Sequence, residues 1–114
     1  MPFSNGLLST STSRPCAALV VDDNEINRKV LARQLQSIPN AQLAVVTAAN
    51  GADAVDVLMS QPGIALVIMD IEMPVMDGLE ATQHIRRLEQ QRGGPHVPII
   101  GLSGNARQVC PLGP

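Results

Sequence analysis

The sequence predicts an α/β domain built on an open, doubly wound parallel sheet, and three observations support this fold class. Residues 17–21 and 64–69 are unbroken aliphatic runs without alternation, which is typical of strands buried on both faces. Strand-like and helix-like segments alternate along the chain, as right-handed crossovers require. Acidic residues follow both runs, at the edge where such sheets place their functional sites.

The first half of the chain supplies strand, helix, strand and helix in turn. After the strand at 17–21, Asp23 or Asn24 can cap a helix that ends at 39–40. Apolar residues recur in it at helical spacing: Ile26, Val30, Leu31, Leu35 and Ile38. A strand is predicted at 43–46. A second helix starts after Asn50-Gly51 and ends at 61–63.

The second half repeats the pattern. The strand at 64–69 leads into Asp70 and a loop over 71–78, in which Asp77 is interpreted as a turn and helix-cap residue. A third helix presents Ala81, Ile85 and Leu88 and breaks at 93–95. A fourth strand at 98–102 ends at Ser103.

Composition narrows the function classes. The chain has 114 residues, 45% of them apolar, which suits one globular domain. A net charge of -2 and a single aromatic residue, Phe3, argue against nucleic-acid binding. No run approaches the length of a membrane span. Cys16 and Cys110 form neither a metal-spaced pair nor a disulfide framework, so we expect a reducing cytoplasm or nucleus.

The acidic residues after the two aliphatic strands predict a metal site. If those strands are neighbours, Asp70 meets Asp22 or Asp23 at close range, and like charges there favour a bound cation. Carboxylates, waters and phosphate oxygens are what Mg²⁺ prefers. Asp70 could then attack phosphorus to give an aspartyl phosphate, with Ser103 donating a hydrogen bond to the phosphoryl group.

Three stretches carry a family resemblance: Val-Val-Asp-Asp-Asn at 20–24, Met-Asp-Ile-Glu-Met-Pro-Val-Met-Asp-Gly at 69–78, and Pro-Ile-Ile-Gly-Leu-Ser-Gly-Asn-Ala at 98–106. They resemble the receiver domain of two-component response regulators, particularly receivers of hybrid histidine kinases.

The resemblance implies a flavodoxin-like fold and a role for each site residue. Asp70 would be the phosphoacceptor, and Asp22 and Asp23 would form the Mg²⁺ pocket together with Asp70 and the Glu72 carbonyl. Ser103 would be the switch hydroxyl. The phosphoryl donor would be a phosphohistidine on a histidine kinase or histidine phosphotransfer protein, and the only activities expected of the chain are self-phosphorylation and autodephosphorylation.

The chain departs from the family after Ser103. Receivers continue with a helix, a fifth strand ending in Lys-Pro and a last helix, but the only lysine here is Lys29. We therefore predict a truncated receiver at 16–108 that lacks the fifth strand and last helix, after a disordered Ser/Thr-rich segment at 1–15 and before an irregular tail at 109–114. We expect impaired phosphorylation, a poorly covered first helix, and self-association through an unpaired fourth strand.

Alternative interpretations remain open from the sequence. The chain could be a pseudo-receiver that binds partners without accepting phosphate, or a dehalogenase-like phosphatase with Glu72 as its second acid. The two Asp residues at 22 and 23 could be only a helix cap and a solvated acid. The basic residues of the first helix are interpreted as a solvated face, although the resemblance also makes that helix a candidate docking surface: Arg28, Lys29 and Arg33.

Overall fold

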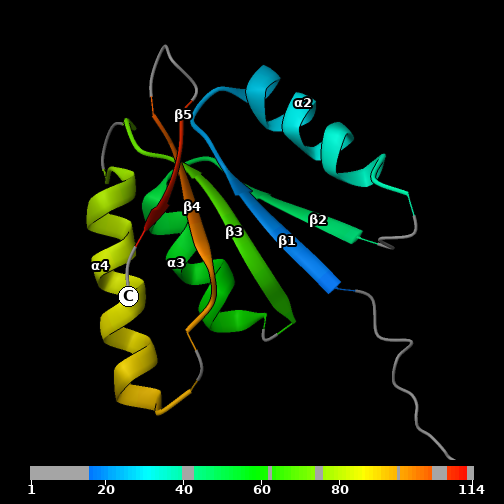
Figure 1. The fold of residues 1–114 in the computed structure, drawn as a ribbon. Coiled ribbons are helices and arrows are strands. Elements are labelled where there is room, and N and C mark those ends of the chain that lie inside the picture. The colour runs from blue at the N-terminus through cyan, green and yellow to red at the C-terminus, as the bar shows by residue number, and fades with distance from the viewer. Residues whose placement is uncertain are drawn as a thin grey trace, which may run out of the picture.

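A single sheet with helices on its faces forms the domain (Figure 1). The computed structural model describes residues 16–39, 43–61, 63–73, 76–94, 96–103 and 108–112, with backbone alone for Ser103 and 108–112. The strands lie in the order β2-β1-β3-β4-β5, with these bounds: β1 Cys16–Val21, β2 Leu43–Ala48, β3 Ile64–Asp70, β4 Ile99–Ser103 and β5 Gln108–Leu112. The helices are α2 Glu25–Gln36, α3 Gly51–Ser60 and α4 Gly78–Arg92. The segment 1–15, predicted to be disordered, lies outside the described residues.

The parallel part of the sheet confirms the predicted fold class. Strand β1 pairs in parallel with β2 and β3, and β3 pairs in parallel with β4. Because β1 lies between β2 and β3, Leu19 stands between Val46 of β2 and Val67 of β3. The last four residues of β1 are at most 1% exposed, as the unbroken aliphatic run predicts for a strand covered on both faces.

The main hydrophobic core lies on the face of the sheet that carries α3 and α4. Leu19 and Val67 of the sheet belong to one buried cluster with Ala54 of α3 and with Ala81 and Ile85 of α4. Side chains alternate between the faces of a strand, so Ala18 and Val20 point to the opposite face. The two faces of the sheet are therefore covered by different helices.

Helix α2 covers that opposite face lightly. Its N-cap is Asn24, not Asp23, because the Asn24 side chain accepts hydrogen bonds from the backbone N–H groups of Ile26 and Asn27. The helix has no buried residue, and the side chains of Ile26 and Val30 are 70% and 49% exposed. This agrees with the expectation that the first helix is poorly covered. No helix of the described residues is long and apolar enough to cross a membrane.

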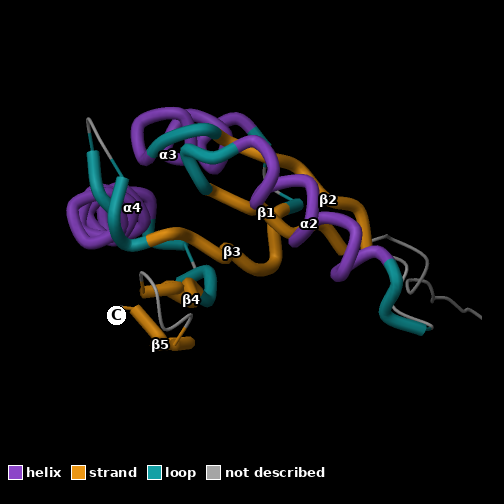
Figure 2. The backbone as a smooth tube through the Cα atoms, turned by 90° about the horizontal axis from the view of Figure 1, so that it is seen from above, coloured by secondary structure: helices purple, strands orange, loops and turns teal. Residues whose placement is uncertain are grey.

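Strand β5 corrects the prediction of an irregular tail and an unpaired fourth strand. Residues Gln108–Leu112 pair antiparallel with β4, and Pro111 stands opposite Ile100. Figure 2 shows β4 and β5 side by side at one end of the sheet, with β2 toward the other end. A proline lacks the N–H that a central strand must donate, but an edge strand tolerates it. The added strand runs antiparallel to β4, unlike the parallel fifth strand that the resemblance implies.

Candidate functional site

Three aspartates meet at the carboxyl end of the central strands. Asp22 and Asp23 come directly after β1, and Asp70 is the last residue of β3. The two strands are adjacent, with Val21 opposite Met69. One carboxylate oxygen from each aspartate lies within 4.8 Å of the others. The parallel pairing thus brings together the three carboxylates that the sequence singles out.

Backbone N–H groups orient two of these carboxylates. The Asn24 N–H donates to Oδ1 of Asp22 at 2.9 Å, and the Glu72 N–H donates to Oδ1 of Asp70 at 3.2 Å. In each case the donor lies two residues further along the chain. Such short loops fix a carboxylate relative to its own strand end.

The environment of Asp70 disfavours its charged form. Partial burial is the main cause that raises the pKa of Asp70, and the negative charges of Asp22, Asp23 and Glu72 raise it further. The hydrogen bond from the Glu72 N–H opposes this shift. A bound cation would offset the cost of burying the Asp70 charge and would relieve the repulsion, because it would compensate three carboxylates at once.

The residue after Asp70 is bonded both to β4 and to the start of α4. The Ile71 N–H donates to the Leu102 carbonyl at 3.0 Å, and the Ile71 carbonyl accepts from the Gly78 N–H at 2.8 Å. A Cβ atom at Gly78 would lie 2.7 Å from the Asp70 carbonyl oxygen. Asp77 caps α4 by accepting from the Glu80 N–H at 2.8 Å, which confirms its interpretation as a cap.

The two other predicted site residues are Glu72 and Ser103. Glu72 is exposed, and its backbone N–H is engaged by Asp70. Ser103 is the last residue of β4 and so ends at the same edge of the sheet, beside the strand that carries Asp70. The side chain of Ser103 lies outside the described part of the chain.

The donor set fits Mg²⁺. The cluster offers only hard carboxylate oxygens, and its members differ in exposure: Asp22 is buried, Asp70 partly buried and Asp23 exposed. Mg²⁺ keeps several waters and takes few carboxylates, so a cluster open on one side suits it better than a closed cage would. Among the described residues, these three form the group with metal-ligand spacing.

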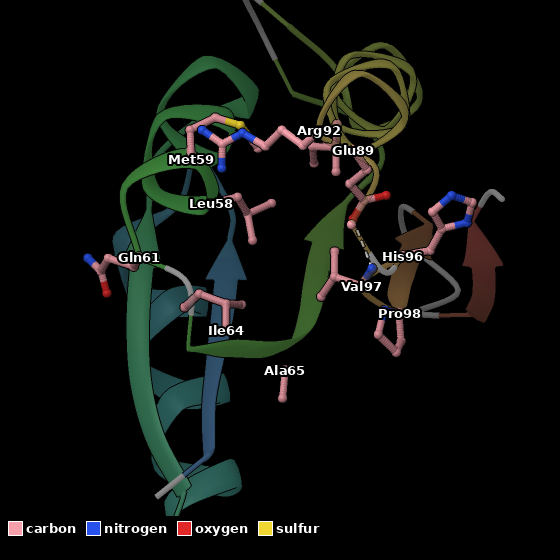
Figure 3. A pocket seen from close by; sticks show the side chains of 12 residues that line it. Leu58, Met59, Gln61, Ile64, Ala65, Glu89, Arg92, His96, Val97 and Pro98 are labelled. Atoms are coloured by element: carbon pink, nitrogen blue, oxygen red, sulfur yellow. Dashed lines mark hydrogen bonds between the residues drawn. The ribbon is translucent and has the colours of Figure 1, made fainter. Parts of the chain in front are cut away.

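A separate groove lies at the opposite edge of the sheet. It has a volume of about 340 Å³ and is bounded by the carboxyl ends of α3 and α4 and the amino ends of β3 and β4. Figure 3 shows Leu58, Ile64 and Val97 around it, with the Glu89 carboxylate accepting a hydrogen bond from the Val97 N–H. None of the three aspartates lines this groove, so it is not part of the acidic site.

One residue at the site was missed by the sequence analysis. Arg28 of α2 donates from Nη1 to the backbone carbonyl of Asp22 at 2.7 Å. Its interpretation as part of a solvated helix face is therefore wrong, although it holds for Lys29, whose side chain is 73% exposed beside Glu25. The six-residue spacing from Asp22 could have suggested the contact only if the direction of α2 were known.

Comparisons with known proteins agree with this geometry. The sequence model of the response regulator receiver domain matches residues 18–110. The sensor histidine kinase RcsC of Escherichia coli K12 is 46% identical over 88 residues, which make up 77% of this chain and 8% of RcsC. The chain thus spans a small part of the curated relatives that it matches.

Solved structures show the same likeness. The receiver domain of the histidine kinase CKI1 from Arabidopsis thaliana, complexed with Mg²⁺ and BeF₃⁻, matches with a TM-score of 0.70 and 34% identity over 81% of this chain and 68% of that one. The Saccharomyces cerevisiae co-crystal of the histidine phosphotransfer protein Ypd1 and the Ssk1 receiver domain gives a TM-score of 0.64 and 31% identity, covering 77% and 61%. By sequence and by fold, the chain belongs to the response regulator receiver domain family of two-component phosphorelays.

Proposed function

We propose that this chain is a phosphoacceptor module in a histidine-to-aspartate phosphorelay and that Asp70 accepts the phosphoryl group. The observation that carries the proposal is the convergence of Asp22, Asp23 and Asp70 at one strand edge. The receiver of CKI1 binds Mg²⁺ and BeF₃⁻, and the Ssk1 receiver forms a complex with a histidine phosphotransfer protein. Both properties are what a phosphoacceptor of this kind requires.

The transfer step uses the Asp70 carboxylate as nucleophile. A carboxylate oxygen attacks the phosphorus of a phosphohistidine, the P–N bond breaks, and the histidine nitrogen leaves with its electron pair. The product is an acyl phosphate on Asp70. The hydrogen bond from the Glu72 N–H holds this carboxylate in one orientation before the attack, which lowers the entropic cost of the step.

The remaining site residues serve the transferring group. We propose that Asp22, Asp23, Asp70 and the Glu72 backbone carbonyl hold Mg²⁺, which when bound neutralises charge on the phosphoryl oxygens. Ser103, at the end of the neighbouring strand, donates a hydrogen bond to the phosphoryl group in this proposal. The donor is a histidine kinase or a histidine phosphotransfer protein.

We further propose that phosphorylation of these 114 residues is slow. Lys29 is the only lysine in the sequence, and its ammonium lies 3.4 Å from Glu25 on the exposed surface of α2. It cannot act as the lysine that receivers carry at the end of their fifth strand. The phosphoryl group therefore loses one cationic partner in the transition state, and such partners commonly contribute a large share of the catalysis.

Intact mass spectrometry tests the phosphoacceptor proposal. The protein is incubated with acetyl phosphate and Mg²⁺, and its mass is followed over time. We expect a gain of one phosphoryl group that hydroxylamine removes and that Asp70→Asn abolishes. The gain should develop more slowly than in the receiver of RcsC treated in parallel.

A matched variant controls for the loss of a carboxylate. Asp56→Asn removes an exposed carboxylate from α3 and should leave the phosphoryl gain unchanged. If the wild-type chain stays unmodified while the RcsC receiver is labelled, the chain is a binding module without phosphoacceptor activity. If Asp70→Asn is still labelled, another residue is the acceptor.

A further inference from the structure

Three hydrogen bonds hold Asp22, at its N–H, its carboxylate and its carbonyl. Its N–H donates to the Ala48 carbonyl of β2 at 3.2 Å. Its carboxylate accepts from the Asn24 N–H, and its carbonyl accepts from Nη1 of Arg28 at 2.7 Å. The first two contacts are made by backbone donors or acceptors. Arg28 is therefore the side chain that completes the attachment of Asp22.

The carbonyl that Arg28 holds lies between two members of the acidic cluster. It belongs to the peptide unit that joins Asp22 to Asp23. Because a peptide unit is planar, fixing its oxygen restricts the rotation on both sides, at ψ of Asp22 and φ of Asp23. These two rotations set the direction of one carboxylate relative to the other. Asp22 is also held at its N–H, whereas Asp23 is exposed and depends more on this peptide plane.

Arg28 bonds to a backbone carbonyl although two acidic side chains lie in the same groove. Asp53 and Asp56 line the same groove as Arg28, at the carboxyl end of β2. Within the described residues, however, the ion pairs are Lys29 with Glu25 and Arg86 with Glu89, so Arg28 pairs with neither acid of the groove. Its described side-chain hydrogen bond goes to a backbone carbonyl at the site instead.

We propose that Arg28 is a positioning residue that orients the Asp22-Asp23 pair and thereby makes the site selective for Mg²⁺ over Ca²⁺. The inference rests on the proposed function, since it assumes that the cluster binds a divalent cation. Mg²⁺ demands near-ideal octahedral geometry, whereas Ca²⁺ accepts flexible coordination with more ligands. Loosening the peptide between the two carboxylates therefore weakens Mg²⁺ binding more than Ca²⁺ binding.

The ratio of the two affinities separates geometry from charge. Removing Arg28 also removes a positive charge near the site, which favours both cations. Because the two ions carry the same charge, this effect largely cancels in the ratio of their dissociation constants. A change in the ratio therefore reports the orientation of the carboxylates.

Calorimetric titration of the chain with each metal alone tests the proposal. The proteins are wild type, Arg28→Met, Arg28→Lys and the control Lys29→Met. For Arg28→Met we expect the Mg²⁺ dissociation constant to rise roughly tenfold, as is common when a residue that orients a metal ligand is lost, and the Ca²⁺ constant to change much less. Arg28→Lys keeps the charge and should lose part of the selectivity. Lys29→Met removes the adjacent, exposed cation and should keep the wild-type ratio.

Each outcome is decisive. An unchanged ratio in both Arg28 variants overturns the positioning role while leaving the phosphoacceptor proposal intact. If Arg28→Met does not fold, the ratio of Arg28→Lys decides alone, and a wild-type ratio there overturns the inference. A change in the ratio for Lys29→Met equal to that for Arg28→Met would assign the effect to the charge of the helix and overturn the positioning role. A wild-type chain that binds neither ion overturns this inference and the proposed metal site together.

Discussion

At the scale of single residues, the acidic cluster makes the ionised form of Asp70 unfavourable. Its pKa is raised above the ordinary value of 3.8, first by burial and then by the charges around it. The folded environment thus penalises the ionised form of this carboxylate. In the absence of metal, the folded state is therefore destabilised by a charge that the unfolded chain keeps fully hydrated.

The pH dependence of Asp70→Asn follows from this shift. The folded state binds the Asp70 proton more tightly than the unfolded state, so the wild type loses stability as pH rises from the ordinary Asp value through the raised one. Asparagine does not titrate. We expect Asp70→Asn to have a higher urea midpoint than wild type at pH 7 without metal, and the difference to shrink as pH is lowered toward 4. Urea titrations followed by circular dichroism measure both.

Metal and a matched variant check the cause. Added Mg²⁺ should stabilise the wild type more than Asp70→Asn, because a cation that binds the folded state alone shifts the unfolding equilibrium. Glu80→Gln, which removes an exposed carboxylate from α4, should not reproduce the gain. An Asp70→Asn variant that is less stable than wild type at pH 7 would contradict the prediction.

The residues of the site could be predicted to different degrees from sequence. Asp22, Asp23 and Asp70 follow aliphatic runs, and neighbouring parallel strands necessarily bring their ends together, so their convergence follows from the pattern. The contact of Arg28 could not be predicted, because it depends on how α2 crosses the sheet. A cation on a helix that is otherwise exposed resembles any solvated residue until that crossing is known.

At the scale of elements, the carboxyl end of α4 is fastened to the start of β4. Nη1 of Arg86 donates to Oε1 of Glu89 and to the Val97 carbonyl, each at 2.8 Å. Oε2 of Glu89 accepts from the Val97 N–H, also at 2.8 Å. Both backbone polar groups of Val97 are thus held by one ion pair, two residues before β4 begins, which fixes where that strand enters the sheet.

Breaking this ion pair should be costly. The side chains of Arg86 and Glu89 are 14% and 10% exposed, so the glutamate charge is largely desolvated and compensated by its partner. Glu89→Gln keeps the shape but removes the charge that pairs with Arg86 at this largely buried contact, and we expect a loss of about 3 kcal/mol in the free energy of unfolding. Chemical denaturation measures it.

Glu80→Gln provides the comparison on the same helix. Glu80 is exposed in the first turn of α4, and its removal should cost less than about 1 kcal/mol. Equal losses in the two variants would show that the contact with Arg86 and Val97 contributes little. The i,i+3 spacing of Arg86 and Glu89 allows an ion pair on a helix, but its attachment to β4 could not be predicted, because Val97 lies outside the helix and its backbone groups have no sequence signature.

The strand at the end of the described chain illustrates a different limit. Pro111 and the glycine and proline that follow Leu112 argue against a strand by local propensity. The exposed edge of β4 nevertheless offers a row of backbone groups to pair with, and β5 occupies it antiparallel. Local propensity rules describe a central strand well but decide little at an edge, where half of the backbone groups need no partner.

At the scale of the whole molecule, the two faces of the sheet are unequal. The buried cluster joins β1 and β3 to α3 and α4, whereas α2 contributes no buried residue. The largest exposed apolar side chains of the described chain include Ile26, Val30 and Ile38, all on or next to α2. Burial of apolar area is the main source of stability, so most of the folding free energy resides on the α3–α4 face.

This asymmetry predicts how the domain opens. Native-state hydrogen exchange should show α2 amides exchanging through a local opening, with protection well below that of β1 and β3, whose amides should exchange only through global unfolding. Low concentrations of urea should accelerate β1 and β3 but leave α2 almost unaffected, since a local opening exposes little surface. The Asn24 N–H and the Arg28 guanidinium tie the start of α2 to Asp22, so Mg²⁺ should slow exchange in its first turns more than in its last. Uniform protection of α2 and β3, with the same dependence on urea, would show instead that the two faces unfold as one cooperative unit.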